Sequence, residues 1–291
     1  MKSRAFAMII TAGILWGTSG IFVHVLSPFG FSSLHMTFFR ALVALVSLAV
    51  FILMRDKSLF KVTPKELLFF AGSGLSFFST ASCYYISMQL TSVSTAVILM
   101  YSAPILVMIY SILFLGEKLT SSKKISILTM LIGCCLVSGV IGGLKFDLWG
   151  IVIGGMAGVS YAIYNIVTKI EMRNGSNPLS ATFYCFTFAT IIALFVCEPT
   201  KISSLIAKNP PTIVLLILGL GICTCVLPYF LYTLSLKELP AGTASALGII
   251  EPLSATIFSV VFFKESLGIT SACGAILILS AVILLSKNKE L

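Results

Sequence analysis

The chain has 291 residues, of which 58% are hydrophobic and 10% are charged, and its formal net charge is +9. A soluble domain has about 25% charged residues, so these charges are too few to solvate a globular surface, and the expected solvent is lipid. The basic excess does not indicate nucleic acid, because the basic residues follow the alternation of loops that is typical of membrane topology.

Ten apolar runs are long enough to cross a bilayer as helices, which takes about 20 residues each. They lie at roughly residues 6–26, 34–54, 67–86, 93–115, 125–144, 149–167, 179–197, 212–234, 241–263 and 269–285. A β-barrel would show alternating polarity in segments of about 10 residues, and the sequence lacks that pattern. The first run has no small-residue cleavage site and is too long for a signal peptide, so we expect it to remain as a span. The sequence predicts an all-α integral membrane protein with ten transmembrane helices.

Basic residues are distributed unequally between the loops that join these runs. Of the 19 lysines and arginines, 14 lie at the termini and loops on the side of the N-terminus, four lie on the opposite side, and Arg40 lies inside the second run. Lysine and arginine are enriched in cytoplasmic loops. We therefore expect both termini in the cytoplasm and residues 142–148 outside.

Two regions of the chain resemble each other at a fixed offset. Residues 94–120 match residues 242–268 at an offset of 148, and the matches include Thr95 with Thr243, Leu99 with Leu247, Pro104 with Pro252 and Glu117 with Glu265. Near the start of each half the offset is 145, which aligns Trp16 with Tyr161. The pattern predicts two copies of one unit, at residues 1–144 and 145–291.

The number of spans determines how the two copies are oriented. Ten spans in two copies give five spans each, and an odd number places the second copy upside down in the membrane. Inverted repeats of this kind are typical of secondary transporters, whose substrate site lies near the midplane between the halves. The sequence thus predicts two inverted five-helix repeats. The predicted loops are too short to hold an energy-converting domain.

Arg40 and Glu251 are the ionisable side chains deepest in the predicted spans. Each costs about 2.5–3.5 kcal/mol at the centre of a membrane helix, so each needs a water-filled cavity or a partner. In a cavity, Glu251 would bind a cationic group or a proton, which makes it the candidate for proton coupling, and Arg40 would bind a carboxylate. The alternative is a structural ion pair, or an Arg40 that caps helix carbonyls.

Aromatic and proline residues supply the other candidates for a central site. The candidate substrate-binding residues, besides the two charges, are Trp16, Tyr84, Tyr101, Tyr161, Asn165, Tyr229 and Tyr232. Their rings can stack on an aromatic ligand or a cation, although buried rings also join helices. Pro104 and Pro252 occupy equivalent positions of the two copies and are candidates for a helix kink or gate near the cavity, because proline removes a backbone hydrogen bond.

No pattern in the sequence indicates an enzyme or a bound cofactor. The eight cysteines all lie in apolar runs without metal-site spacing, so we expect them to fill the apolar interior. No nucleophile with a histidine and an acid, no paired carboxylates and no glycine-rich phosphate loop stand out. We expect no enzyme activity, no cofactor, no metal site and no nucleic-acid partner.

Several segments resemble the EamA family of the drug/metabolite transporter superfamily. They are AGILWGTSGIFV in the first span, Phe39–Arg40, Pro104 with Gly116–Glu117, and Glu251–Pro252. The chain departs from the repeated motif at Lys264, where the first copy has Gly116. The resemblance implies ten helices in a bacterial cytoplasmic membrane, and efflux of small metabolites such as amino acids or their toxic analogues. It also implies a central cavity surrounded by spans 1, 3, 4, 6, 8 and 9.

The function we expect is a secondary exporter of amino acids or related zwitterions and amines, working by alternating access in the lipid bilayer as a monomer or weak homodimer. An importer or exchanger of small metabolites is the nearest alternative. A membrane sensor or assembly protein without flux is the alternative from another class.

Overall fold

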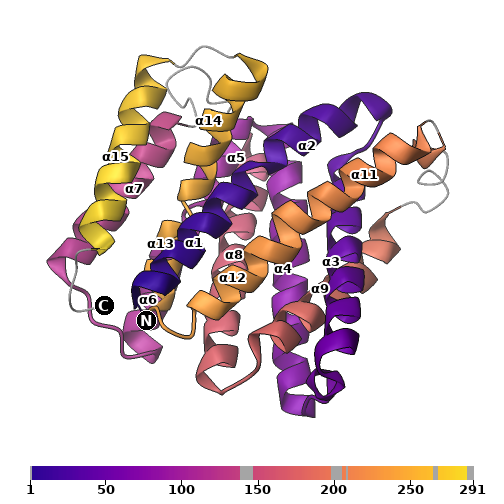
Figure 1. The fold of residues 1–291 in the computed structure, drawn as a ribbon. Coiled ribbons are helices and arrows are strands. Elements are labelled where there is room, and N and C mark those ends of the chain that lie inside the picture. Colours follow the sequence, from indigo (N-terminus) through magenta and orange to yellow (C-terminus); the bar gives the residue numbers. More distant parts are fainter. Residues whose placement is uncertain (1, 138–146, 198–204, 208, 265–267, 287–291) are drawn as a thin grey trace.

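The computed structural model describes residues 2–137, 147–197, 205–207, 209–264 and 268–286, and within them the regular secondary structure is helical. The helices are α1 (Lys2–Gly17), α2 (Ser19–Leu26), α3 (Ser33–Arg55), α4 (Pro64–Leu90), α5 (Val93–Met100), α6 (Ala103–Phe114), α7 (Ser121–Val137), α8 (Leu148–Arg173), α9 (Pro178–Val196), α11 (Pro210–Gly221), α12 (Leu227–Ser235), α13 (Ala241–Leu247), α14 (Ile250–Phe263) and α15 (Ile269–Ser286). They form one bundle in which α1 begins and α15 ends at the same end (Figure 1).

Eight helical segments are long and apolar enough to cross a membrane. They are Ser3–Phe29, Ser33–Arg55, Pro64–Leu90, Thr95–Phe114, Leu148–Arg173, Pro178–Val196, Pro210–Ser235 and Ala241–Phe263, and Ile269–Leu285 is a shorter apolar helix. The prediction of a helical membrane protein is therefore confirmed at the level of these segments. The expected span at 125–144 corresponds to α7, and its last part lies outside the described residues.

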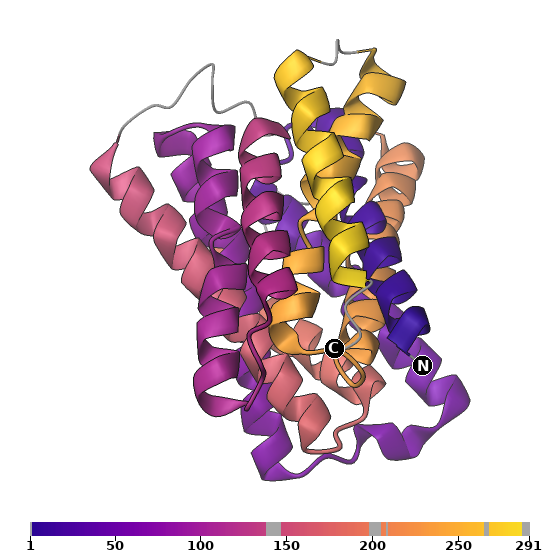
Figure 2. The ribbon, with the colours of Figure 1, turned by 90° about the vertical axis from the view of Figure 1, so that its left-hand side faces the viewer.

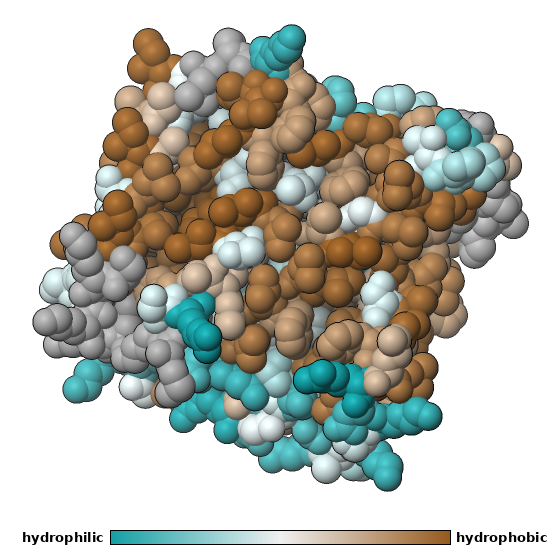
Figure 3. All heavy atoms as spheres, viewed as in Figure 1, coloured by the Kyte–Doolittle hydropathy of each residue, from teal (hydrophilic) through white to brown (hydrophobic). Residues whose placement is uncertain are grey.

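Apolar side chains cover the flanks of the bundle. Hydrophilic ones gather at the end where α1 begins (Figure 3). Large apolar side chains point outward on these flanks, and Phe195 is 88% exposed. Such a continuous apolar surface needs an apolar surrounding, which agrees with burial in lipid. The second view, in which the left-hand side of Figure 1 faces the viewer, shows α7 and α15 side by side in front (Figure 2).

Capping boxes fix where two of the spans begin. The Ser32 hydroxyl accepts a hydrogen bond from His35 N at 3.3 Å, and His35 Nδ1 accepts one from Ser32 N at 3.2 Å. At the start of α4, Thr63 Oγ1 accepts from Glu66 N at 3.3 Å, and Glu66 Oε2 accepts from Thr63 N at 2.9 Å. Each box satisfies backbone donors that the helix leaves unpaired.

Two of the spans are broken at related positions. One break separates α5 from α6 at residues 101–102, and the other separates α13 from α14 at residues 248–249. Pro104 and Pro252, the candidates for a kink or gate, each lie in the first turn of the second helix, just after the break. Proline is favoured there because the first turn needs no donor from its nitrogen. Discontinuous helices are typical of transporter substrate sites.

Glycines bring the first helix of each half close to a broken span. A Cβ on Gly13 would lie 2.9 Å from Ile250 Cβ, and one on Gly17 would lie 2.6 Å from Ser254 Cβ, so α1 packs tightly on α14. A Cβ on Gly158 would lie 2.5 Å from Leu99 O, so α8 packs equally tightly on α5. The repeat relates the Gly13–Ile250 contact to the Gly158–Leu99 contact. The offset of 145 aligns Gly13 with Gly158, and the offset of 148 aligns Ile250 with residue 102, which is three residues from Leu99.

Candidate functional site

A cavity of about 600 Å³ lies within the bundle. This volume falls in the usual range of about 300–1,000 Å³ for small-molecule pockets. Its lining includes the sequence candidates Trp16, Arg40, Tyr84, Tyr101, Tyr161, Tyr229, Glu251 and Pro252. The fold therefore brings residues from both halves of the chain, more than 200 positions apart in the case of Arg40 and Glu251, around one space.

The cavity extends to one end of the bundle. Its lining includes Ser33 and Val93, the first residues of α3 and α5, and Met88 near the end of α4. We call this the open end, and we call the end at which α13 begins the closed end. The hydrophilic end of Figure 3 is the closed end.

Arg40 projects from the middle of α3 into the cavity wall. Its guanidinium carbon lies 5.2 Å from the centre of the Phe77 ring, a cation–π contact. Its Nε has no hydrogen-bond partner among the described residues. The side chain lies within electrostatic range of Tyr85, Tyr229 and Glu251. A planar guanidinium with an unused donor is suited to a carboxylate, which it binds through paired hydrogen bonds.

Glu251 lies in the first turn of α14, directly after the helix break. Its Oε2 accepts a hydrogen bond of 2.9 Å from the Tyr101 hydroxyl. A carboxylate is stabilised at a helix N-terminus by the unpaired backbone donors and the helix dipole. Among the described residues the ion pair within 4.0 Å is Lys123 with Glu117, so Arg40 and Glu251 do not neutralise each other by direct contact. The structural ion pair considered from the sequence is therefore absent from the described structure.

Aromatic rings cover the wall of the cavity between the two charges. The Tyr229 ring lies 5.1 Å from Trp16, 5.2 Å from Phe77 and 5.6 Å from Tyr164, measured between ring centres. The contacts are edge-to-face, which is a favourable arrangement for aromatic pairs. Trp16 Nε1 is buried and has no hydrogen-bond partner among the described residues.

Three of the sequence candidates do not line the cavity. Asn165 and Tyr232 are fully buried toward the closed end, where the Tyr232 hydroxyl donates to Asn165 Oδ1 and Asn165 Nδ2 donates to Tyr161 O at 2.6 Å. Pro104 is also buried, within α6. Helical periodicity placed Tyr161 and Asn165 on one face correctly, but Tyr161 lies at the floor of the cavity and Asn165 lies one turn below it.

Glu117 forms a buried ion pair and also links the two halves of the chain at the closed end. Lys123 Nζ lies 2.8 Å from Glu117 Oε2, and the Lys123 side chain is 2% exposed. Glu117 Oε1 accepts a hydrogen bond of 2.7 Å from Ala241 N, at the start of α13. Glu117 thus links the end of α6 to the first residue of a helix in the second half.

Two further basic side chains cross the closed end. Lys169 Nζ donates to Leu236 O at 2.6 Å and to Leu239 O at 2.7 Å. Arg173 Nη1 donates to Leu115 O at 3.1 Å. These bonds satisfy carbonyls that helix ends leave unpaired, and they tie α8 to both halves.

Comparison with known proteins identifies the chain. The model of the EamA-like transporter family matches residues 3–139 and 148–287. The chain belongs to this family. An uncharacterized transporter of Archaeoglobus fulgidus is 29% identical over 280 residues, which cover 96% of this chain and 94% of that protein. The uncharacterized transporter YwfM of Bacillus subtilis is 24% identical over 295 residues, which cover 98% and 95%.

A solved structure has a similar fold. One crystal structure superposes with a TM-score of 0.80 at 19% identity, and covers 98% of this chain and 96% of its own. The uncharacterized inner membrane transporter YicL of Salmonella typhimurium is 23% identical over 296 residues, which cover 97% of this chain and 95% of that protein. EamA-like proteins are transporters and not enzymes, so the cavity of this multi-pass membrane protein is a candidate transport site.

The sequence did not single out one buried carboxyl of this EamA-like transporter. Glu171 is 2% exposed, and its Oε1 has no hydrogen-bond partner among the described residues. The predicted span ended at residue 167, whereas α8 continues to Arg173. A prediction that the helix continues through residues 168–173 would have placed Glu171 inside the bundle.

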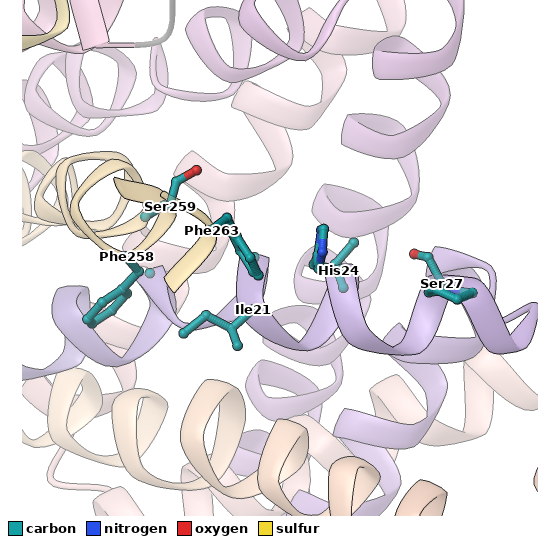
Figure 4. A pocket seen from close by; sticks show the side chains of 11 residues that line it. Ile21, His24, Ser27, Phe258, Ser259 and Phe263 are labelled. Atoms are coloured by element: carbon teal, nitrogen blue, oxygen red, sulfur yellow. The ribbon is translucent and has the colours of Figure 1, made fainter. Parts of the chain in front are cut away.

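A second pocket of about 630 Å³ lies beside the cavity of this EamA-like transporter, between α2 and α14. Ile21 and His24 of α2 face Phe258, Ser259 and Phe263 of α14 there (Figure 4). The His24 and Phe263 ring centres are 4.1 Å apart. The residues that line both spaces are Gly17, Gly20, Val23 and Ala255. A thin wall of mostly small residues therefore separates the pocket from the cavity.

Proposed function

We propose that this EamA-like transporter is a secondary transporter that exports amino acids, or related zwitterions and amines, across a bacterial cytoplasmic membrane by alternating access. The observation that carries the proposal is the cavity itself. It holds Arg40 and Glu251 among aromatic rings, and the two charges make no ion pair with each other.

The chemistry of the cavity supports a zwitterionic substrate. Arg40 offers a guanidinium for a carboxylate, and Glu251 offers a carboxylate for an ammonium group. The rings of Trp16, Tyr101 and Tyr229 line the space near these charges, and aromatic faces attract cations and apolar side chains. A charge inside a membrane is costly, so a substrate that pairs with both groups would gain much of its binding energy from them.

An inverted repeat of two five-helix units, residues 1–144 and 145–291, supports alternating access. The helix breaks at 101–102 and 248–249 fall at nearly equivalent positions of the two copies. The close contacts of Gly13 and Gly158 are related by the same offsets. Two similar halves in opposite orientations can exchange their shapes, and the exchange would open the cavity to the other side.

The orientation in the membrane rests on the basic residues, and the proposed direction of transport rests on the family resemblance. Lysines and arginines such as Lys57, Lys61 and Lys65 lie at the closed end, which we assign to the cytoplasm with both termini. In that orientation the described structure faces outward. Import or exchange through the same cavity is the alternative within transport.

Glu251 is the proposed proton carrier. It is the carboxyl that lines the cavity, and it lies next to the helix break. An imposed pH gradient should accelerate concentrative transport by the wild-type protein, whereas residual exchange by Glu251→Gln should be independent of the gradient. Wild-type flux that does not respond to the gradient would favour a uniporter.

The function can be tested with purified protein and a panel of amino acids, amines, carboxylic acids and nucleosides. A ligand that binds the folded state raises the unfolding temperature by mass action, and counterflow in liposomes then tests whether it is carried. We expect amino acids to give both responses. If no compound shifts the unfolding temperature or exchanges, the non-transporting sensor or assembly protein becomes the better account.

A further inference from the structure

The closed half of the bundle contains polar side chains that are shielded from water and lack partners. Every residue of α13 is buried, and the hydroxyls of Thr243 and Ser245 have no hydrogen-bond partner among the described residues. A buried hydroxyl without a partner is costly. The small and hydroxyl side chains of α13 would avoid this cost if the helix surface contacted water in another conformation of the protein.

The repeat identifies which surface that is. On α5 the residues Val93, Val97 and Met100 line the open cavity at helical spacing. The offset of 148 residues relates them to Ala241, Ser245 and Gly248, which form the corresponding face at α13 and are all buried. The face that lines the cavity in the first half thus has a dry counterpart in the second half.

A second helix shows the same relationship. Trp16, Gly20 and Val23 line the open cavity from α1 and α2. The offset of 145 residues relates them to Tyr161, Asn165 and Thr168 on α8. Asn165 is fully buried and Thr168 is 2% exposed, whereas Tyr161, which is 8% exposed, lies at the floor of the open cavity.

The two faces meet at Tyr161 and Gly248. The Tyr161 hydroxyl is 3.1 Å from the position that a Cβ on Gly248 would take, so α8 and α13 meet there without space for a substrate. Glu117 holds the first residue of α13 through the 2.7 Å bond to Ala241 N. We call the contact between the Tyr161, Asn165, Thr168 face and the Ala241, Ser245, Gly248 face the inner seam.

We infer that the inner seam is the second half of the substrate path, and that it opens and binds water and substrate when the cavity closes at its present open end. The inference rests on the proposed alternating access and adds the residues that perform it. The seam offers phenol, amide and hydroxyl groups and no charge. It would therefore conduct a polar solute away from Arg40 and Glu251 without holding it as tightly.

Thiol labelling at single positions tests the inner seam. Ser245→Cys, in sealed vesicles of known orientation, is exposed to a membrane-impermeant maleimide on the side of the closed end, and modification is read by mass spectrometry of the peptide that contains position 245. Ala246→Cys is the matched control, because Ala246 is equally buried on α13 and its counterpart Ile98 does not line the cavity. Val97→Cys reports access from the open end.

We expect Ser245→Cys to react at least ten times faster than Ala246→Cys, and only from the closed end, while Val97→Cys reacts only from the open end. A saturating transported substrate should change both rates. Thr168→Cys replaces Ser245→Cys if the latter fails to fold, and it should behave in the same way.

Two results would overturn the inner seam. Equal reaction at positions 245 and 246 would indicate local fraying of α13. A Ser245→Cys thiol that stays unmodified in vesicles that exchange substrate would place the path elsewhere and leave the proposed function intact. Absence of exchange together with an unmodified Ser245→Cys thiol would contradict the proposed function as well.

Discussion

The Tyr101 hydroxyl donates a 2.9 Å hydrogen bond to Glu251 Oε2, and the two residues come from the broken spans of the two halves. Tyr101 lies in the break between α5 and α6, and Glu251 lies directly after the break between α13 and α14. Movement of one half against the other therefore changes this contact. The pair couples the orientation of the carboxylate to the arrangement of the halves.

Removing the Tyr101 hydroxyl should weaken substrate binding moderately. A net hydrogen bond contributes about 0.5–1.5 kcal/mol, so Tyr101→Phe should lower the affinity by roughly 2–10-fold because Glu251 is less well oriented. The ring remains, and the unfolding temperature should change little. Isothermal titration of the transported ligand measures the effect. Tyr110→Phe is the matched control, because Tyr110 does not line the cavity; an equal loss in both variants would contradict the role of Tyr101.

Arg40 should select substrates by their carboxylate. Arg40→Gln should reduce the affinity for an amino acid by roughly 10–100-fold, since a hydrogen bond to a charged group contributes about 1.5–3 kcal/mol. The affinity for the amine that lacks the carboxylate should be unchanged. Competition binding with the matched pair of ligands distinguishes the two cases. Equal losses for amino acid and amine would mean that Arg40 supports the fold and does not contact the carboxylate.

The buried pair Glu117–Lys123 should show strong energetic coupling. Leaving one charge of a buried pair without its partner costs about 3–5 kcal/mol, whereas replacing both costs much less. Glu117→Gln should therefore lower the unfolding temperature markedly, and the double variant Glu117→Gln, Lys123→Met should recover most of it. Thermal unfolding of the purified variants tests the cycle. Additive losses in the double variant would show that the two side chains act independently.

Two glycines of α8, Gly155 and Gly158, should respond differently to an added methyl group. A Cβ on Gly158 would lie 2.5 Å from Leu99 O, a backbone atom, while a Cβ on Gly155 would meet nothing within 4 Å. Gly158→Ala should destabilise by about 1–3 kcal/mol through overpacking. Gly155→Ala should be neutral or slightly stabilising, because alanine favours helices. The reverse order of unfolding temperatures would contradict the packing of α8 on α5.

The charges of the cavity were predictable because lipid makes them costly. Arg40 and Glu251 stand out in apolar runs, and the fold brings both to the same cavity. That tyrosines such as Tyr84, Tyr101 and Tyr229 would line a polar cavity was also predictable, since buried hydroxyls need hydrogen-bond partners.

The depth of the cavity was not predictable from the sequence. Periodicity assigns Asn165 to the same face as Tyr161, but it carries no information on where the two halves close against each other. Glu171 and Lys169 were missed for a different reason. Charged residues at the end of an apolar run look like a loop, and only the packing of α8 shows that the helix continues past them to Arg173.

The most direct test of the account is amino-acid counterflow in liposomes by the wild-type protein and by the double variant Arg40→Gln, Glu251→Gln. The account predicts rapid exchange by the wild type, and exchange at the level of empty liposomes by a double variant that still unfolds cooperatively near the wild-type temperature. Wild-type exchange rates in the folded double variant would contradict it, because the two charges would then take no part in carrying the substrate.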